Sequence, residues 1–528
     1  MAKYLFFRIL RGMLSVILVV AIVMILIYSL QNRDLIFATD PVYSKQQSNA
    51  KIVYKEQQWE KYGYVDYVTF ADYLLELKNK GELSQEDYKS AVVLGATSSG
   101  SYDSDLTKKY TAAFRFRYEA KGYRVERLAG DLKPGSTNKY KTGGQPQLYA
   151  TKDIPVTVRL WKYFTGLITV DNIHAAKGEI ENRGLTFTLF DPVYGGEKLS
   201  FAIMGNGTMH KYLLYFSDTF PYIHQNLIRL NLGKSYAVNR GVDVFVTMTE
   251  SQGEMVKGLV HYPTGWVEQT ADDLHTATYV EGSYAQSQLL YKNYFVDDYT
   301  NISTRKSGFS RMGYSFLIGM IAVLLAYLVG VPLGTLMALK KNRFTDKLGS
   351  VYIIFIIAVP SLAYIFLFKA IGQKLFGLPG VFDIVSGDLK VYILPIISLA
   401  LPSVAVLMKW IRRYMIDQMN SDYVKFARSG GLSEGEIFYK HIFKNAIIPI
   451  AHGIPGAVLG ALVGAIITES VYVVPGTGNL LTKAINSYDN GVIVGVTLFY
   501  AFLSVISILL GDILMALCDP RISLSSKK

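Results

Sequence analysis

The stretch DYVKFARSGGLS, residues 422–433, organises the rest of this sequence. It is polar and basic, and it lies between two long apolar segments that are typical of membrane spans. Gly430 and Gly431 allow a left-handed backbone and the close approach of a partner, so they predict a tight turn between two short helices. Ser433 and Glu436 have the spacing of a capping box, which predicts that the second helix begins at Ser433.

The second helix of this hairpin is expected to run through apolar residues and to end near Pro449, where a backbone donor is lost. Its apolar residues are Ile437, Phe438, Ile442 and Phe443. A short helical hairpin on one face of a membrane bundle is a natural docking surface. The alternative is an ordinary amphipathic loop between two spans, and the local pattern favours neither.

The length, composition and charge of the chain limit the possible functions. Its 528 residues predict more than one domain, and half of them are hydrophobic. The single cysteine, Cys518, excludes an intrachain disulfide and a cysteine-cluster metal site. A net charge of +12 is compatible with nucleic acid or anionic lipid as a partner. Because the basic residues cluster beside apolar segments, we attribute them to membrane topology and expect no nucleic-acid partner.

Six apolar segments are long enough to cross a bilayer core of about 30 Å. The first, Gly12–Leu30, is too long for a cleaved signal peptide and has no small-residue cleavage site after it, so we expect an uncleaved span. Prolines and glycines interrupt several of the others, which is tolerated where neighbouring helices satisfy the freed backbone groups. The other five segments are residues 312–339, 348–368, 391–408, 445–472 and 491–517.

Basic residues mark one side of the membrane. They follow the second span, they fill the hairpin region 413–448 between the fourth and fifth spans, and they end the chain, whereas the short loops on the other side carry balanced charge. Positive residues favour the cytoplasm. We therefore expect a multi-pass protein of the cell membrane with both termini and the hairpin in the cytoplasm and with residues 31–311 outside the cell.

Residues 31–311 form a large polar insertion between the first two spans. Alternating or β-branched runs predict strands at 156–160, 185–189 and 242–246, whereas 67–78 and 220–230 are predicted to be helical. The high aromatic content argues against disorder. The insertion is therefore expected to be a folded, mixed α/β domain.

No residue pattern supports catalysis by this chain. The seven histidines are scattered and lack zinc-binding spacing on a helix. Residues 95–100 have the glycine spacing of a phosphate loop, but Ser101 and Tyr102 follow where Lys-Ser/Thr is required, which favours a surface loop. We expect no enzyme activity, no metal site and no ATP hydrolysis by this chain.

Small and acidic residues stand out in the last two spans. Gly456, Gly460 and Gly464 recur at a spacing of four, which lets helix backbones approach closely. Packing within the chain, a subunit interface and a translocation path are all compatible with them. Glu469 and Asp512 are acids near opposite ends of their spans, and such an acid usually faces a cavity or a partner. An interfacial carboxylate satisfied by nearby backbone is the alternative.

Taken together, these stretches resemble the binding-protein-dependent permeases of ABC importers, and more narrowly their oligopeptide and dipeptide branch. The likeness covers roughly residue 312 to the end, plus the first span. Lys425-Phe426-Ala427 departs from the Glu-Ala-Ala of the general family loop, Phe443-Lys444 replaces its later Leu-Pro, and the insertion is much longer than the external loop usual at this place. The residues that carry the likeness are Ala427, Gly431, Leu432, Ser433, His441, Asn445, Ala446 and Pro449, the run ESVYVVPGTGNL at 469–480, and Asp512 with Asp519-Pro520-Arg521.

The resemblance implies a membrane core of six transmembrane helices of the type I ABC importer kind, with a mixed α/β extracellular domain between helices 1 and 2. The expected domains are 1–30, 31–311 and 312–528. The implied function is that of a permease subunit, which forms a peptide path with a second, homologous permease. Two separate ATPase subunits would bind ATP and Mg and drive transport, and an extracellular peptide-binding protein, expected to be a lipoprotein, would deliver the peptide. This chain would bind no cofactor of its own and would be surrounded by membrane lipid.

The residue patterns described above and the resemblance together predict two sets of site residues. The residues expected to couple the chain to the ATPases are Asp422, Tyr423, Ala427, Gly430, Gly431, Leu432, Ser433 and Glu436. The residues expected at a gate or along the translocation path are Glu469, Pro475, Gly476, Gly478, Gly456, Gly460 and Gly464.

Two other functions compete with transport. A membrane sensor with an extracellular ligand-binding domain would need a cytoplasmic effector domain, but the longest cytoplasmic loop is the hairpin. A membrane-bound external enzyme would need a nucleophile or metal cluster within 31–311, and none is recognisable. Proteins that co-purify with the chain would discriminate, since ATPases favour transport and a kinase favours sensing.

Overall fold

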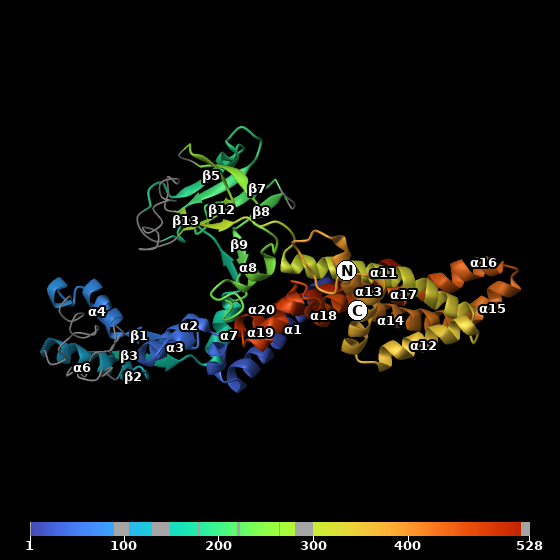
Figure 1. The fold of residues 1–528 in the computed structure, drawn as a ribbon, viewed down its shortest axis with the longest axis horizontal. Helices are drawn as coiled ribbons and strands as arrows, with labels where there is room; N and C mark the ends of the chain where they lie inside the picture. The colour runs from blue at the N-terminus through green and yellow to red at the C-terminus, as the bar shows by residue number, and fades with distance from the viewer. Residues whose placement is uncertain are drawn as a thin grey trace. The chain divides into compact units, whose positions relative to one another are not determined.

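A computed structural model describes residues 2–88, 105–128, 148–176, 180–218, 222–262, 265–279 and 299–518 (Figure 1). The chain divides into two compact units, one formed by 21–165 and 487–490 and the other by 1–20, 166–486 and 491–528. The glycines at 95–100 and the Asp519-Pro520-Arg521 motif lie outside the described residues. The 31–311 insertion contributes to both units, and its boundaries as a domain stay a prediction.

The smaller unit holds a three-stranded antiparallel sheet in the order β1-β3-β2. Aromatic and aliphatic side chains of α4, α6 and β3, including Phe70, Leu74, Phe114 and Leu148, are buried together and form its core. Its strands are β1 (Val65–Thr69), β2 (Arg124–Arg127) and β3 (Leu148–Asp153). Its helices are η1 (Arg33–Phe37), α2 (Pro41–Lys45), α3 (Ser48–Lys61), α4 (Phe70–Asn79), α6 (Asp105–Glu119) and α7 (Val156–Thr165).

The second half of the insertion is rich in strands. A four-stranded antiparallel sheet has the order β5-β6-β7-β8, and three two-stranded pairs, β4-β9, β10-β11 and β12-β13, accompany it. Its core contains Tyr212, Leu274 and Tyr299. The strands are β4 (Ile168–Val170), β5 (Gly184–Thr188), β6 (Ala202–Asn206), β7 (Tyr212–Phe216), β8 (Ile223–Gln225), β9 (Ile228–Leu230), β10 (Gly258–His261), β11 (Val267–Thr270), β12 (Asp272–Tyr279) and β13 (Tyr299–Thr304), and the helices are η2 (Pro192–Tyr194) and α8 (Val244–Thr249).

The mixed α/β character predicted for the insertion is confirmed, but several of its elements were predicted wrongly. The strand at 185–189 is found as β5, and the predicted helix at 67–78 is β1 followed by α4. The strand predicted at 156–160 is helix α7, in which the buried Arg159 guanidinium lies 3.6 Å from the ring centre of Tyr28 and 3.9 Å from that of Tyr64. Such tertiary contacts outweigh the strand preference of β-branched residues.

Two further elements also differ from their predictions. The strand predicted at 242–246 is largely helix α8, which buries Val244 and Met248 one turn apart. The helix predicted at 220–230 is replaced by β8, which pairs with the preceding strand β7, and by β9, which pairs with β4, about 60 residues earlier in the chain. In both cases partners elsewhere in the chain select the structure.

Within the residues that the structure describes, five helices are long and apolar enough to cross a membrane. They are α1 (Ala2–Leu30), α11 (Arg311–Leu339), α14 (Ile393–Met419, preceded by the turn η3, Leu389–Tyr392), α18 (Ile454–Tyr472) and α20 (Asn490–Cys518). The shorter helices are α12 (Phe344–Ala358), α13 (Ser361–Phe376), α15 (Asp422–Ser429), α16 (Glu434–Glu436), the π-helix η4 (Ile437–Phe443), α17 (Lys444–His452) and α19 (Thr477–Asn486).

The predicted span 348–368 is not one straight helix. It is divided between α12 and α13, which are bent by 116° at the break before Ser361. Pro360 is the N-cap of α13, where it cannot continue the preceding helix, whereas Pro332 and Pro402 lie inside α11 and α14. The predicted count of six spans is reached only if this bent pair is one span.

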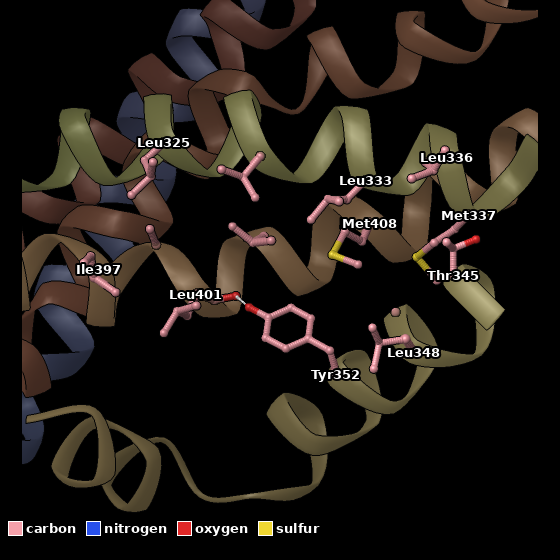
Figure 2. A pocket seen from close by; sticks show the side chains of 14 residues that line it. Leu325, Leu333, Leu336, Met337, Thr345, Leu348, Tyr352, Ile397, Leu401 and Met408 are labelled. Carbon is pink, nitrogen blue, oxygen red and sulfur yellow. Dashed lines mark hydrogen bonds between the residues drawn. The ribbon is translucent and has the colours of Figure 1, made fainter. Parts of the chain in front are cut away.

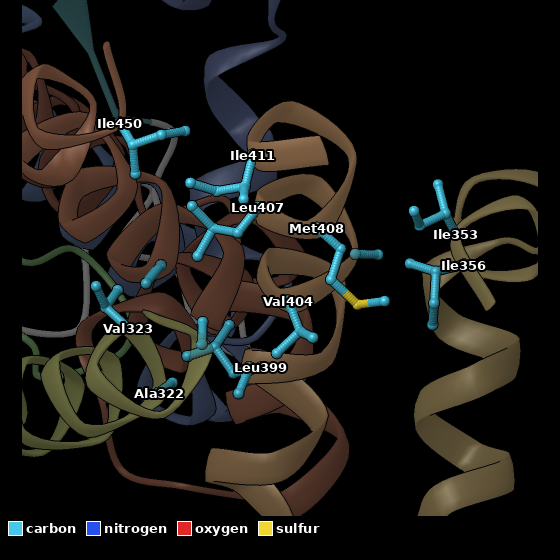
Figure 3. Close-up of a cluster of buried hydrophobic side chains, with 14 of the residues drawn as sticks. Ala322, Val323, Ile353, Ile356, Leu399, Val404, Leu407, Met408, Ile411 and Ile450 are labelled. Carbon is cyan, nitrogen blue, oxygen red and sulfur yellow. The ribbon is translucent and has the colours of Figure 1, made fainter. Parts of the chain in front are cut away.

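Close packing of α11 on α14 forms the centre of the helical bundle. A Cβ atom added at Gly330 would lie 2.9 Å from Leu407 Cβ, and one added at Gly334 would lie 2.9 Å from Ile411 Cβ. Figure 3 shows the buried side chains around this contact, with Val404, Leu407, Met408 and Ile411 on α14. The two glycines therefore let these helices approach closely.

Candidate functional site

The turn between α15 and α16 has the backbone geometry of a Schellman motif. The amide of Leu432 donates to the carbonyl of Ala427 (3.3 Å), and the amide of Gly431 donates to that of Arg428 (3.1 Å). Gly431 has φ +82°, which confirms the predicted left-handed position. Gly430 was predicted to share this freedom, but it has φ −77° and simply caps α15. Only Gly431 therefore requires glycine for its backbone conformation.

The capping box predicted at Ser433 is confirmed. The Glu436 amide donates to Ser433 Oγ (3.3 Å), and the Ser433 amide donates to the Glu436 carboxylate (3.4 Å). The helix it starts turns into the π-helix η4 and then into α17. The predicted end near Pro449 is wrong, because Pro449 lies inside α17, which continues to His452. Bundled membrane helices tolerate such a proline when neighbours satisfy the freed carbonyl.

The predicted coupling residues divide into an inner and an outer group. Ala427 is buried with Val424 and Ile437, so it packs the two arms of the hairpin together. The Tyr423 hydroxyl accepts a hydrogen bond from Asn445 Nδ2 (3.0 Å) and also contacts the His441 carbonyl and the Gln418 side chain, so it ties the arms at their base. These two residues shape the hairpin from within.

The outer group lies at the surface of the hairpin, where two aromatic rings are also exposed. Phe426 is 80% exposed and Tyr439 is 69% exposed. Neither was singled out from the sequence, although their place opposite the buried Val424 and Ile437 is the helical-period signal that identifies them. Leu432 and the open backbone of Gly431 also lie on the exposed side of the turn.

Ion pairs form a charged rim on the same hairpin. Asp422 pairs with Lys425 (2.8 Å) and Arg428 with Glu434 (2.6 Å). The hydrogen bond from Lys425 lowers the pKa of Asp422 below its ordinary value, and that from Arg428 does the same for the pKa of Glu434. The hydroxyl of Ser433 is the main cause that lowers the pKa of Glu436. These carboxylates are therefore ionised at neutral pH, and the hairpin presents exposed ion pairs as well as exposed aromatic rings.

The second candidate site is a buried carboxylate. Glu469, near the end of α18, is only 1% exposed. It accepts hydrogen bonds from Ser315 Oγ on α11 (2.6 Å) and from the amide of Asn479 in the first turn of α19 (2.9 Å). Ser315 Oγ in turn accepts from the amide of Thr477 (2.9 Å). One carboxylate at a helix N-terminus thus joins three helices, an arrangement that the helix dipole favours.

The glycines beside Glu469 leave it room. A Cβ atom at Gly476 would lie 2.3 Å from the Glu469 carboxyl carbon, and one at Gly478 would lie 2.6 Å from the Cα atom of Ile466. Pro475 precedes this turn. Val473 holds the left-handed conformation at φ +58°, which is unusual for a β-branched residue and indicates backbone strain. The sequence did not single out Val473 or Ser315, which lies 154 residues from Glu469.

We call Glu469, its partners Ser315 and Asn479 and the glycines Gly476 and Gly478 the carboxylate lock. The glycine series of α18 lies apart from this lock. No described atom lies within 4 Å of a Cβ atom built at Gly456 or Gly460, and both are exposed. This excludes packing against the described chain as the reason for these two glycines. Gly464 lies about one turn beyond Gly460 in α18. The other membrane acid, Asp512, forms an ion pair with Arg8 of α1 (3.0 Å).

Comparison with known proteins identifies the relatives of this chain. The family described as binding-protein-dependent transport system inner membrane component matches residues 330–524. The oligopeptide transport system permease protein AmiC of Streptococcus pneumoniae is 35% identical over 100% of this chain and 99% of that protein. The dipeptide transport system permease protein DppB of Lactococcus lactis is 32% identical over 43% of this chain and 74% of that protein. Among solved structures, an amino acid ABC transporter is similar over 40% of this chain and 92% of that chain, at 20% identity and a TM-score of 0.31.

Proposed function

We propose a mechanism that starts from one premise: the chain belongs to the family of binding-protein-dependent transport system inner membrane components. It is a permease subunit of an ABC importer for peptides, with the type I importer fold and several membrane-spanning helices. In this family ATP is hydrolysed by separate subunits.

The hairpin docks on the ATPase subunits. The observation that carries this role is the pair of exposed rings, Phe426 and Tyr439, on two arms that a Schellman turn and the Tyr423 contacts hold together. Exposed aromatic residues with a charged rim are typical of the centre of a protein interface. The partner subunits bind ATP and Mg, and their closure moves the hairpin and the helices attached to it.

The buried carboxylate closes the opposite, external end of the path. Glu469 on α18 is hydrogen-bonded to the first turn of α19 and to Ser315 of α11. A movement of one of these three helices relative to the others must therefore break a buried hydrogen bond. A second, homologous permease completes the path. The exposed face of α18 that carries Gly456 and Gly460 is the surface proposed to line that path or to meet the second permease.

The insertion binds the extracellular peptide-binding protein. A movement of the insertion on this binding is transmitted to α19. Leu232, Val244 and Met248 of the insertion are buried in one cluster with Leu480 and Ala484 of α19. The insertion therefore packs directly on α19, the helix whose first turn is hydrogen-bonded to Glu469. Both termini and the hairpin are cytoplasmic in this proposal, because the basic residues gather on that side.

A matched pair of aromatic substitutions tests the central role. Phe426→Ala should release the ATPase subunits from the purified complex and abolish ATP-driven peptide uptake in reconstituted vesicles. Phe116→Ala is the control, because Phe116 is also 80% exposed but lies on α6, far along the chain from the hairpin. If both variants keep the ATPases and transport peptide normally, the hairpin is only a connecting loop. A co-purifying kinase in place of ATPases would favour the sensor alternative.

A further inference from the structure

An apolar cavity lies among α11, α12 and α14, as Figure 2 shows. Its volume is about 440 Å³, within the range of ligand-binding pockets. Of the side chains that line it, only Thr345 and Tyr352 carry polar atoms. The Tyr352 hydroxyl donates to the Leu401 carbonyl (2.7 Å), so it is already satisfied. A cavity with this lining has too few polar partners to hold water and instead suits an apolar ligand.

The cavity is open along one side. Val329, Leu333 and Leu336 on α11 and Leu348 on α12 line it and are also exposed. The first three belong to α11, which is long and apolar enough to cross a membrane, and Leu348 belongs to α12 of the bent pair α12–α13. The open side is therefore expected to face the bilayer, where the apolar molecules at hand are lipid acyl chains.

Positive charge surrounds the end of the cavity at the start of α12. Lys340, Lys341, Arg343 and Lys347 are all exposed, and within the described chain none of them forms an ion pair. The one acid among them, Asp346, is occupied, because Arg412 contacts its two carboxylate oxygens at 2.5 and 2.8 Å. A negatively charged headgroup would thus meet four available cations and no available carboxylate from this loop.

The start of α12 adds donors for an anion. Arg343 is the N-cap of this 15-residue helix and makes no side-chain capping hydrogen bond. The buried Thr345 hydroxyl, which lines the cavity, has no hydrogen-bond partner among the described residues. Helix N-termini bind phosphate through free amides and the helix dipole. An anion at this end of the cavity would therefore satisfy groups that the chain itself leaves unsatisfied.

We infer that this site binds one anionic phospholipid, with an acyl chain in the cavity and the headgroup phosphate beside Lys340, Lys341 and the start of α12. The inference rests on the proposed function only for the orientation that places residues 340–347 at the cytoplasmic membrane surface. Basic pockets between membrane helices on that side suit anionic headgroups. The lipid bridges α12 to α11 and α14 at the point where the Asp346–Arg412 pair also joins α12 to α14.

Lipid retention by the purified full chain, together with the subunits that co-purify with it, tests the inference. The protein is exchanged into detergent with equal amounts of phosphatidylglycerol and phosphatidylcholine, and bound lipid is identified by native mass spectrometry. We expect one retained phosphatidylglycerol. Lys340→Gln with Lys341→Gln should reduce the preference over phosphatidylcholine by roughly tenfold or more, at the known strength of lysine–anionic lipid attraction. Lys374→Gln with Lys390→Gln, also exposed lysines, is the matched control and should change nothing.

A rim variant tests the apolar half. Leu333→Trp enlarges a side chain that is 40% exposed, so it can obstruct the cavity without repacking the core, and it should lower retention of both lipids. Excess inorganic phosphate should leave the lipid bound, because the acyl chain contributes to binding. Equal retention of the two lipids by the unmodified chain, retention unaffected by both the lysine and the Leu333 changes, or displacement by phosphate would each overturn the inference. None of these readouts needs ATP hydrolysis or uptake, so failure here is distinct from failure of the transport role.

Discussion

The hairpin and the carboxylate lock use glycine for opposite reasons. At Gly431 the backbone is left-handed and a Cβ atom would meet no described atom within 4 Å. At Gly478 φ is not positive, but a Cβ atom would lie 2.6 Å from the backbone of Ile466. Gly431 therefore requires glycine because of its backbone conformation, and the space beside it is open. Gly478 requires glycine because other atoms of the chain already fill the space that a side chain would need.

The acids of the two regions differ in the same way. Glu436 caps a helix on the surface, where water replaces any bond it loses. Glu469 is buried, so water cannot replace the hydrogen bonds that its donors would lose. The comparison teaches that a substitution in the lock should first damage the fold of this chain, whereas a substitution in the hairpin should first damage what the chain does with its partners.

Removal of the Glu469 carboxylate should have the largest effect. Glu469→Ala leaves the Asn479 amide buried without its acceptor, at about 1–3 kcal/mol, and it limits Ser315 Oγ to the Thr477 hydroxyl (3.0 Å) as its remaining side-chain partner. We expect a lower thermal midpoint of the purified complex and little peptide uptake. Glu469→Gln keeps one acceptor oxygen and the side-chain volume, so its loss should be smaller. An alanine variant as stable and active as the unmodified chain would show that the lock holds nothing.

Gly478→Ala should come next, because the added methyl group meets backbone that cannot move independently of α18. Overpacking of this kind costs about 1–3 kcal/mol. The matched control is Gly184→Ala in β5, where φ is also not positive but a Cβ atom would meet no described atom within 4 Å, and it should change stability by about 0.5 kcal/mol or less. Equal thermal midpoints for the two variants would remove the distinction between filled and open glycine sites.

The two regions also differ in how far the sequence predicts them. The hairpin is local: its left-handed Gly431 and its Ser433–Glu436 capping box lie within a few residues, so both were predicted and are confirmed. The lock is not local, since Ser315 and Glu469 are 154 residues apart, and no periodic pattern connects them. The role of either region in coupling or gating stays a prediction.

The same reason explains the wrong elements. The β-branched run at 156–160 became α7, because contacts of Arg159 with Tyr28 and Tyr64 decide its structure. The predicted span that contains Pro360 is interrupted there, whereas α11 and α14 continue through Pro332 and Pro402. The helices packed around each proline, and not the proline itself, decide which of the two outcomes occurs. The insertion looked exceptional for the family, yet the likeness to AmiC extends over all of this chain.

Gly431→Asp should affect the function of the complex more than the stability of this chain. The fold should lose only about 1–2 kcal/mol for a side chain in the left-handed region, and Asp is among the residues that tolerate it best. The new carboxylate enters the space left for a partner, so we expect the ATPases to be shed or hydrolysis to be uncoupled from uptake in vesicles. Gly387→Asp is the control, because Gly387 is also left-handed (φ +62°) and open but lies in another loop. A Gly431→Asp complex that remains coupled would show that this space belongs to no partner.

Ser433→Ala should have the smallest effect, and a small effect is the result that this prediction requires. The substitution removes the hydroxyl that accepts from the Glu436 amide, at about 1 kcal/mol, while Glu436 keeps its contact with Lys440 (3.3 Å). The cap shapes the hairpin from within, so ATPase binding and coupling should persist with only a slightly lower thermal midpoint. Thr69→Ala provides the control, because Thr69 and Asp72 form the same capping box at α4, within the insertion. The two variants should therefore lose similar stability and transport equally well. If Ser433→Ala alone releases the ATPases, the Ser433 hydroxyl itself contacts the partner, and the hairpin surface must then be extended beyond Phe426, Tyr439 and the turn at Gly431.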